Sequence, residues 1–113
     1  MSEHYDKIAR ATGAAAVAMT VTNPRPGHKW QLKEVRVHLS AVGTAGNLTV
    51  TIDSGTNVVY DTVLKTQDMT SITDMYWQPE KPIILDSTDE IDIAWANSGT
   101  KTYGVEVVYA PLF

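Results

Sequence analysis

The sequence contains no cysteine, and this absence excludes several classes of protein at once. Without thiols the chain forms no disulfide bonds, carries out no thiolate catalysis and builds no cysteine-based zinc site. Packing and hydrogen bonds alone must therefore stabilise the fold. A single domain of 113 residues has the length for this, since a chain of that size buries about two-thirds of its unfolded surface.

Long hydrophobic runs are also missing. No stretch of about eighteen apolar residues occurs, and the opening Met-Ser-Glu-His-Tyr-Asp-Lys lacks the basic and then apolar segments of a secretion signal. We therefore expect a protein that is made in the cytoplasm and has no membrane anchor. Hydrophobic residues at 43% and charged residues at 19% are typical of an ordinary globular domain.

Positive charge is scarce over most of the chain, whose net charge is −4. Residues 1–36 carry six basic and three acidic residues, whereas residues 37–113 carry three basic and ten acidic ones. An acidic chain argues against nucleic-acid binding, which needs clustered Lys and Arg. The uneven distribution indicates either one acidic face or a means of steering unlike surfaces of neighbouring copies together.

No clear helical pattern is present, and short alternating segments take its place. The two clearest, residues 48–53 and 91–95, alternate apolar and polar residues with the period of two that a half-buried strand requires. About eight such segments follow one another at spacings of about eight to twelve residues. This pattern predicts an all-β fold over residues 14–113, a two-sheet antiparallel sandwich of the jelly-roll type.

Within residues 28–39 the alternation changes phase. Trp30 and Leu32 belong to one phase and Val35 belongs to the other. Because side chains alternate faces along a strand, this change predicts a β-bulge or a bend. Trp30 and Trp95 are both in phase with aliphatic neighbours, so we expect both in the core.

Two further local features are predicted from turn residues. The turn residues around Gly55 predict a hairpin between residues 48–53 and 58–64, followed by a polar loop over residues 65–70. Residues 83–85 come directly after Pro82. Proline has no backbone N–H to donate, so in a sheet it is found where that hydrogen bond is not needed, as at an edge strand. This segment is therefore predicted to be a short edge strand.

Residues 1–13 are polar and end in Ala-Thr-Gly, so they are predicted to form an N-terminal arm outside the sandwich domain. Such an arm is ordered only where something holds it. Tyr5 and Ile8 give it two apolar anchors, and Lys7 and Arg10 give it positive charge. These four residues are candidate contacts to a partner.

No catalytic, metal-binding or cofactor-binding residue is assigned. His4, His28 and His38 do not stand at metal-ligand spacing, and no phosphate-binding loop or nucleophile elbow occurs. His38 sits among alternating polar positions and is expected on a solvent-facing surface. The acidic run over residues 86–90 offers oxygen ligands for calcium, but Asp and Ser are also ordinary turn residues. We therefore expect a protein that is not an enzyme.

Tyr76 and Trp77 break the alternation, so one of the two rings should face away from the core. An exposed aromatic ring marks either a protein interface or a platform for a ligand such as a sugar. Both residues are therefore candidate partner contacts.

The sequence also resembles the small accessory virion proteins of tailed bacteriophages, which include jelly-roll capsid decoration or cement proteins. The resemblance spans residues 14–110 and consists of the strand pattern together with short sequence segments. These segments are Gly27-His28-Lys29-Trp30 through Leu39, Leu48-Thr49-Val50-Thr51-Ile52-Asp53-Ser54, Trp77-Gln78-Pro79, Pro82-Ile83, Asp89-Glu90-Ile91-Asp92-Ile93 and Tyr103-Gly104-Val105-Glu106.

The resemblance implies a non-enzymatic structural protein of the virion that binds the major capsid protein, or another virion protein, and stabilises the head shell. It also implies a homo-oligomer, either a trimer or a dimer, in which the arm and the basic first third contact the shell. No nucleic acid, membrane or cofactor is expected as a partner. The alternative is a carbohydrate- or receptor-binding module of a phage tail or adhesin, acting through Tyr76 or Trp77.

Overall fold

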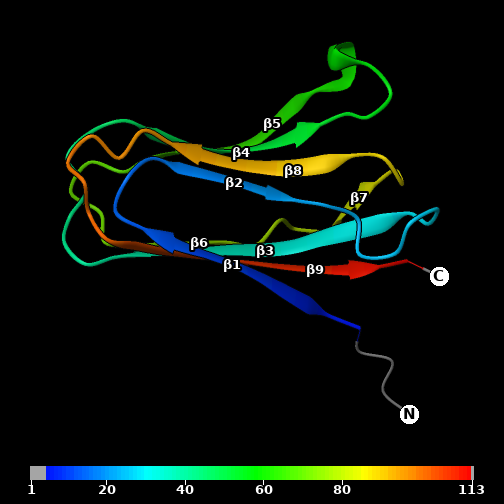
Figure 1. The fold of residues 1–113 in the computed structure, drawn as a ribbon, viewed down its shortest axis with the longest axis horizontal. Coiled ribbons are helices and arrows are strands. Elements are labelled where there is room, and N and C mark those ends of the chain that lie inside the picture. The colour runs from blue at the N-terminus through cyan, green and yellow to red at the C-terminus, as the bar shows by residue number, and fades with distance from the viewer. Residues whose placement is uncertain (1–4, 113) are drawn as a thin grey trace.

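The computed structural model describes residues 5–112, which form nine β-strands and one short 3-10 helix in two layers (Figure 1). In chain order the elements are β1 (Lys7–Gly13), β2 (Val17–Val21), β3 (Trp30–Leu39), β4 (Asn47–Asp53), η1 (Val58–Tyr60), β5 (Thr62–Asp68), β6 (Asp74–Trp77), β7 (Ile83–Leu85), β8 (Glu90–Trp95) and β9 (Tyr103–Pro111).

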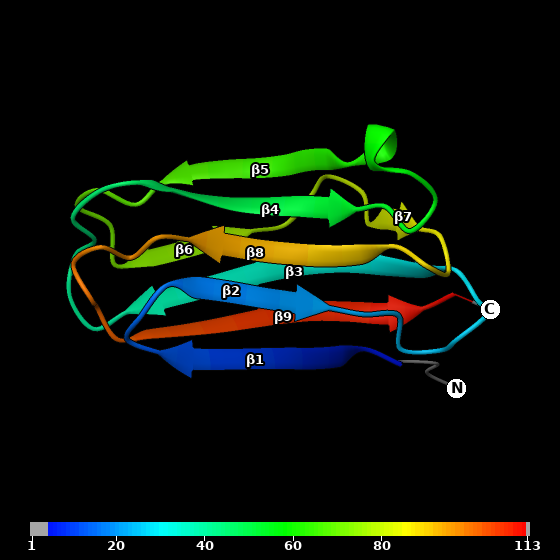
Figure 2. The ribbon, with the colours of Figure 1, turned by 45° about the horizontal axis from the view of Figure 1, so that its top comes forward.

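The strands form two antiparallel sheets that face one another (Figure 2). One sheet has the order β1-β9-β3-β6, with β7 pairing β3 as well, and the other has the order β2-β8-β4-β5. The first strand thus lies beside the last, and the second beside the last but one in the opposite sheet. This order is that of a jelly roll, so the predicted all-β sandwich is confirmed.

The core fills the space between the sheets. Alternate residues of the central strands point inward, and the largest fully buried side chains are Trp30, Leu32, Leu39, Leu48, Met69, Leu85, Ile91 and Ile93. Burying one Leu or Ile side chain contributes about 1.5–3 kcal/mol. This cluster is the main source of stability in a chain without disulfides.

The predicted irregularity in β3 is confirmed. Its pairing with β9 shifts register between Leu32 and Glu34, and both phases of the strand place their apolar residues in the core. The two predicted core tryptophans are also confirmed, because Trp30 and Trp95 are only 0% and 3% exposed. Each indole N–H donates to a backbone carbonyl, that of Asp86 or Ala45.

The expected N-terminal arm differs in the structure. Residues 7–13 form β1, which pairs with β9 along its whole length, from Lys7 opposite Tyr109 to Gly13 opposite Tyr103. Ala9 and Ala11 pack against the core, and Lys33 donates to Asp6 at 2.6 Å. Alanine gives only a weak apolar signal, which is why the strand was not predicted. Residues 1–4 of the expected arm lie outside the described residues.

The hairpin after Gly55 is confirmed in its pairing but not in its boundaries. β4 pairs with β5, yet residues 58–60 form η1, and β5 occupies most of the predicted loop. The Asn57 side chain caps η1 by accepting a hydrogen bond from the Val59 N–H at 3.0 Å. This local turn overrides the strong β-propensity of the Val-Val-Tyr sequence.

Candidate functional site

The predicted partner contacts lie at opposite edges of the five-stranded sheet. The strand order places β1 at one edge and β6 at the other. Tyr5 precedes β1 and is exposed, and the other candidates are Lys7, Ile8 and Arg10 on β1 and Tyr76 and Trp77 on β6. The structure therefore does not gather them into one patch.

Only Ile8, Arg10 and Tyr76 share the outer face of this sheet. Arg10 is opposite Glu106, which is opposite Arg36, which is opposite Tyr76, and residues opposite one another point to the same face. Trp77 lies on the inner face and packs against the core, whereas Tyr76 is 62% exposed. The prediction that one of the two rings faces away from the core is confirmed.

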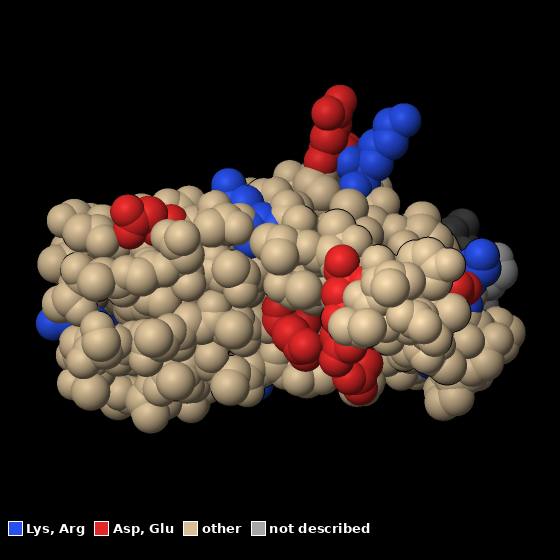
Figure 3. All heavy atoms as spheres, turned by 90° about the horizontal axis from the view of Figure 1, so that it is seen from above, with Lys and Arg blue, Asp and Glu red and all other residues tan. Residues whose placement is uncertain are grey.

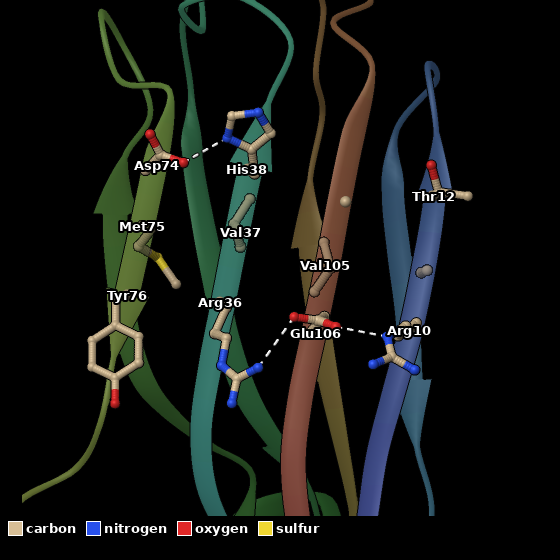
Figure 4. Close-up of a pocket in the computed structure, with 12 residues that line it drawn as sticks. Arg10, Thr12, Arg36, Val37, His38, Asp74, Met75, Tyr76, Val105 and Glu106 are labelled. Atoms are coloured by element: carbon tan, nitrogen blue, oxygen red, sulfur yellow. Dashed lines mark hydrogen bonds and ion pairs between the residues drawn. The ribbon is translucent and has the colours of Figure 1, made fainter.

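Charged side chains link the strands across this outer face (Figure 4). Glu106 accepts a hydrogen bond from Arg10 at 2.6 Å and another from Arg36 at 3.2 Å. Arg36 also donates to Glu34 at 2.6 Å. The hydrogen bond from Arg10, followed by that from Arg36, holds the pKa of the Glu106 carboxyl below its usual value. Glu34 and then Glu106 raise the pKa of Arg36.

A second pair lies one row along the same face. His38 Nδ1 is 2.6 Å from a carboxylate oxygen of Asp74, and Thr73 donates to the other oxygen at 3.0 Å. The hydrogen bond to His38 is the larger reason why the pKa of Asp74 lies below its usual value. His38 is on the solvent-facing surface, as predicted.

The surface over these two rows is hollowed into the outer-face groove, which we define as the groove that passes over Gly104. Its volume is about 550 Å³, and its polar and aromatic lining comes from Arg10, Thr12, Arg36, His38, Asp74, Tyr76 and Glu106. These side chains come from four strands, β1, β9, β3 and β6, and Figure 4 shows them projecting from the sheet.

A second distinctive surface lies on the opposite sheet, at the turn between β4 and β5 and the start of β5. Val58, Val59, Tyr60 and Val63 are 74%, 75%, 63% and 58% exposed, and we call them the knob. In Figure 1 the coiled ribbon of η1, which carries three of these residues, stands above the rest of the sandwich. Apolar residues of this size are normally buried, and a cluster of them at the surface marks an interaction site.

The knob is held in place by turn chemistry. The Asp61 carboxylate accepts from the Ser54 N–H at 2.8 Å, and the Asp61 N–H donates to the Val58 carbonyl at 3.0 Å. Gly55 lies so close to the β7–β8 turn that a Cβ atom there would overlap the Thr88 carbonyl oxygen. The exposed apolar residues are therefore presented on a fixed support.

Carboxylates lie beside the knob. Figure 3, which views the molecule from the side on which the knob stands, shows acidic side chains gathered beside uncharged surface. Asp61 adjoins η1, and the neighbouring β7–β8 turn carries Asp86 and Asp89, of which Asp89 accepts from the Gly55 N–H at 3.2 Å. Lys29 lies 3.9 Å from Asp86. The knob is thus an apolar surface with an acidic margin.

No protein-family model matches this chain, and no curated protein matches it in sequence. Within residues 5–112, no group of three or more His, Cys, Asp and Glu side chains is placed to hold a metal ion. The described part of the chain also contains no helix long and apolar enough to cross a membrane.

Neither surface was predicted as a unit from the sequence. The groove joins Arg36, His38, Asp74 and Glu106, which are far apart in the chain and meet only through strand pairing. The alternation of charge in β3 was the available signal for the groove. The Val-Val-Tyr run was the signal for the knob, but it was assigned to a strand.

Proposed function

We propose that this chain is a non-enzymatic structural protein of a phage virion, a decoration or cement protein that binds the head shell through the knob. The observation that carries the proposal is the presence of three consecutive apolar residues, 74%, 75% and 63% exposed, on a rigid support. The resemblance to small accessory virion proteins supports the identity of the partner.

The knob suits attachment to a protein surface. Burying one Val side chain fully contributes about 1.5–3 kcal/mol, so a partner that covers the three valines of the knob gains several kcal/mol. The fixed support lowers the entropy that is lost on binding, because the side chains are already in place. The acidic margin favours a partner surface that is apolar at its centre and basic around it.

The basic first third is less available for this contact than the sequence indicated. Arg10 and Arg36 are both paired with Glu106, and Lys33 is paired with Asp6. Ion pairs of this kind neutralise much of the positive field that would attract a shell. We therefore assign the shell contact to the knob in preference to β1.

The test uses a double variant, Val58→Ser with Val59→Ser, in particles assembled with the major capsid protein encoded in the same genome. No side chain of η1 is buried, so the variant should keep the fold. Losing two buried valines, about 3 kcal/mol or more, should lower the binding constant for shells by about a hundredfold. Occupancy is measured by mass spectrometry of purified particles.

Ile84→Ser is the matched control, because Ile84 is 56% exposed on the other sheet. It should leave occupancy unchanged. Equal occupancy for the double variant and the wild type would contradict the proposal. Sedimentation velocity on the same variants tests whether the knob instead binds a second copy of this chain. A change in oligomeric state in the double variant would assign the knob to contacts between copies.

A further inference from the structure

The outer-face groove is shaped by a missing side chain. Gly104 is the second residue of β9, opposite His38 on β3 and Thr12 on β1. A Cβ atom added at Gly104 would meet nothing within 4 Å. Here, between β1 and β3, the sheet therefore exposes bare backbone, with taller side chains on the strands at either side.

Every charged side chain that lines the groove already has a partner of opposite charge or a hydrogen bond. Arg10 and Arg36 both pair with Glu106, and His38 pairs with Asp74. An ionic ligand would have to replace contacts that are as short as 2.6 Å. A ligand without net charge leaves these pairs intact, so the groove favours such a ligand.

These pairs still leave groups for hydrogen bonding. Among the described residues Arg10 donates to Glu106 through Nε, so its Nη groups have donors left for further hydrogen bonds. A carboxylate accepts at about four lone-pair sites, more than the contacts to Asp74 occupy. Paired guanidinium and carboxylate groups thus present donors and acceptors side by side, as vicinal hydroxyl groups require.

The groove also has an apolar wall. Tyr76 is 62% exposed at the β6 side, and its ring offers a flat face beside the polar groups (Figure 4). A ligand that matches both features carries many hydroxyl groups and one apolar C–H face. Pyranose sugars have this combination, and aromatic rings with a polar handle suit such mixed surfaces.

We infer that the outer-face groove binds a neutral saccharide, with Gly104 as its floor, Tyr76 as its stacking surface and the Arg10, Glu106 and His38 side chains as hydrogen-bonding groups. The volume of about 550 Å³ lies within the range of about 300–1,000 Å³ for small-molecule sites. This inference goes beyond the proposed attachment to a head shell and does not rest on it, because the knob lies on the other sheet.

The test is an NMR titration of the ¹⁵N-labelled full chain with oligosaccharides at millimolar concentration. The probes are neutral oligomers of glucose, galactose, mannose, rhamnose and N-acetylglucosamine, and sodium sulfate serves as the ionic comparison. We expect saturable shifts of the Gly104, His38 and Thr12 amides with at least one oligosaccharide, and weaker shifts with sulfate. If no oligosaccharide gives saturable shifts there, the inference is overturned.

Gly104→Val is the decisive variant, because valine fills the groove without meeting another atom at its Cβ position. It should weaken saccharide binding by at least about tenfold, the equivalent of about 1.4 kcal/mol, while the remaining amide spectrum stays folded. Tyr76→Ala should weaken binding less, and the knob double variant should not change it. If Gly104→Val binds the saccharide with unchanged affinity, the saccharide binds elsewhere. If Gly104→Val changes the oligomeric state of the protein, the groove is a protein interface. Either result overturns the inference.

Discussion

The knob and the outer-face groove are both exposed, but their side chains are arranged in opposite ways. The knob presents apolar residues without polar partners on a turn that is held by local hydrogen bonds. The groove presents charged residues that are paired with one another across four strands. Exposure alone therefore does not define a binding surface. Whether the polar groups of the surface are present and already paired decides which class of partner the surface fits.

Two glycines, one in each region, also differ in how closely they are packed. Gly55 supports the knob by close approach to Thr88, where no side chain fits, whereas Gly104 leaves open space above the sheet. The same substitution at the two positions should therefore have opposite effects on stability. This pair of positions offers the sharpest test of how the two regions are built.

The largest effect is expected for Gly55→Ala. The new Cβ overlaps the Thr88 carbonyl oxygen, so one of the two turns must move. Overpacking of this kind costs about 1–3 kcal/mol in the free energy of unfolding. Urea unfolding followed by tryptophan fluorescence measures the change, and a midpoint equal to that of the wild type would show that the knob is not fixed to the β7–β8 turn.

A smaller effect of opposite sign is expected for Gly104→Ala, the matched variant in the groove. Glycine in the interior of a strand is less stable than alanine by about 0.5–1 kcal/mol, and here the added methyl group meets no atom. The urea midpoint should therefore rise slightly. A fall in the midpoint would mean that the floor of the groove is more crowded than described.

The smallest effect concerns pH and the charge network. The folded-state pKa of Glu106 lies below its usual value of 4.5, so its carboxylate stabilises the fold above that pH and loses this contribution as the pH falls through the lowered pKa. Glu106→Gln should therefore be less stable than the wild type near neutral pH, and the difference should vanish in acid. Glu80→Gln, at an exposed loop position, is the control. A difference that persists in acid would show that the ion pairs are not its source.

The predictable part of the fold was the part that depends on a period of two. Leu48, Val50, Ile91 and Ile93 alternate with polar residues and all lie in the core. The same signal failed for β1, whose inward residues include Ala9 and Ala11. Alanine is small and only weakly hydrophobic, so its alternation with polar residues is hard to detect. Strand assignment from sequence therefore depends on the size of the buried side chains.

The knob and the groove were harder to predict for different reasons. At the knob, the Asn57 cap converted a Val-Val-Tyr run with strong β-propensity into η1, a local effect that outweighs pattern. In the groove, Arg36 and Glu106 are 70 positions apart and meet only through the register of β3 with β9. Pairing across a sheet is a global property, so the sequence indicated a charged strand face but not the residues opposite it.

The pairing of the first strand with the last has a mechanical consequence. β1 and β9 are antiparallel neighbours, with Lys7 opposite Tyr109 where β1 begins and β9 nears its end. Tension between the two ends of the chain would therefore pull on one pair of residues at a time, from Lys7 and Tyr109 toward Gly13 and Tyr103. Strands opened in this order separate at low force. A load applied at the knob, as the proposed attachment implies, would act on the sandwich and not on this pair of strands.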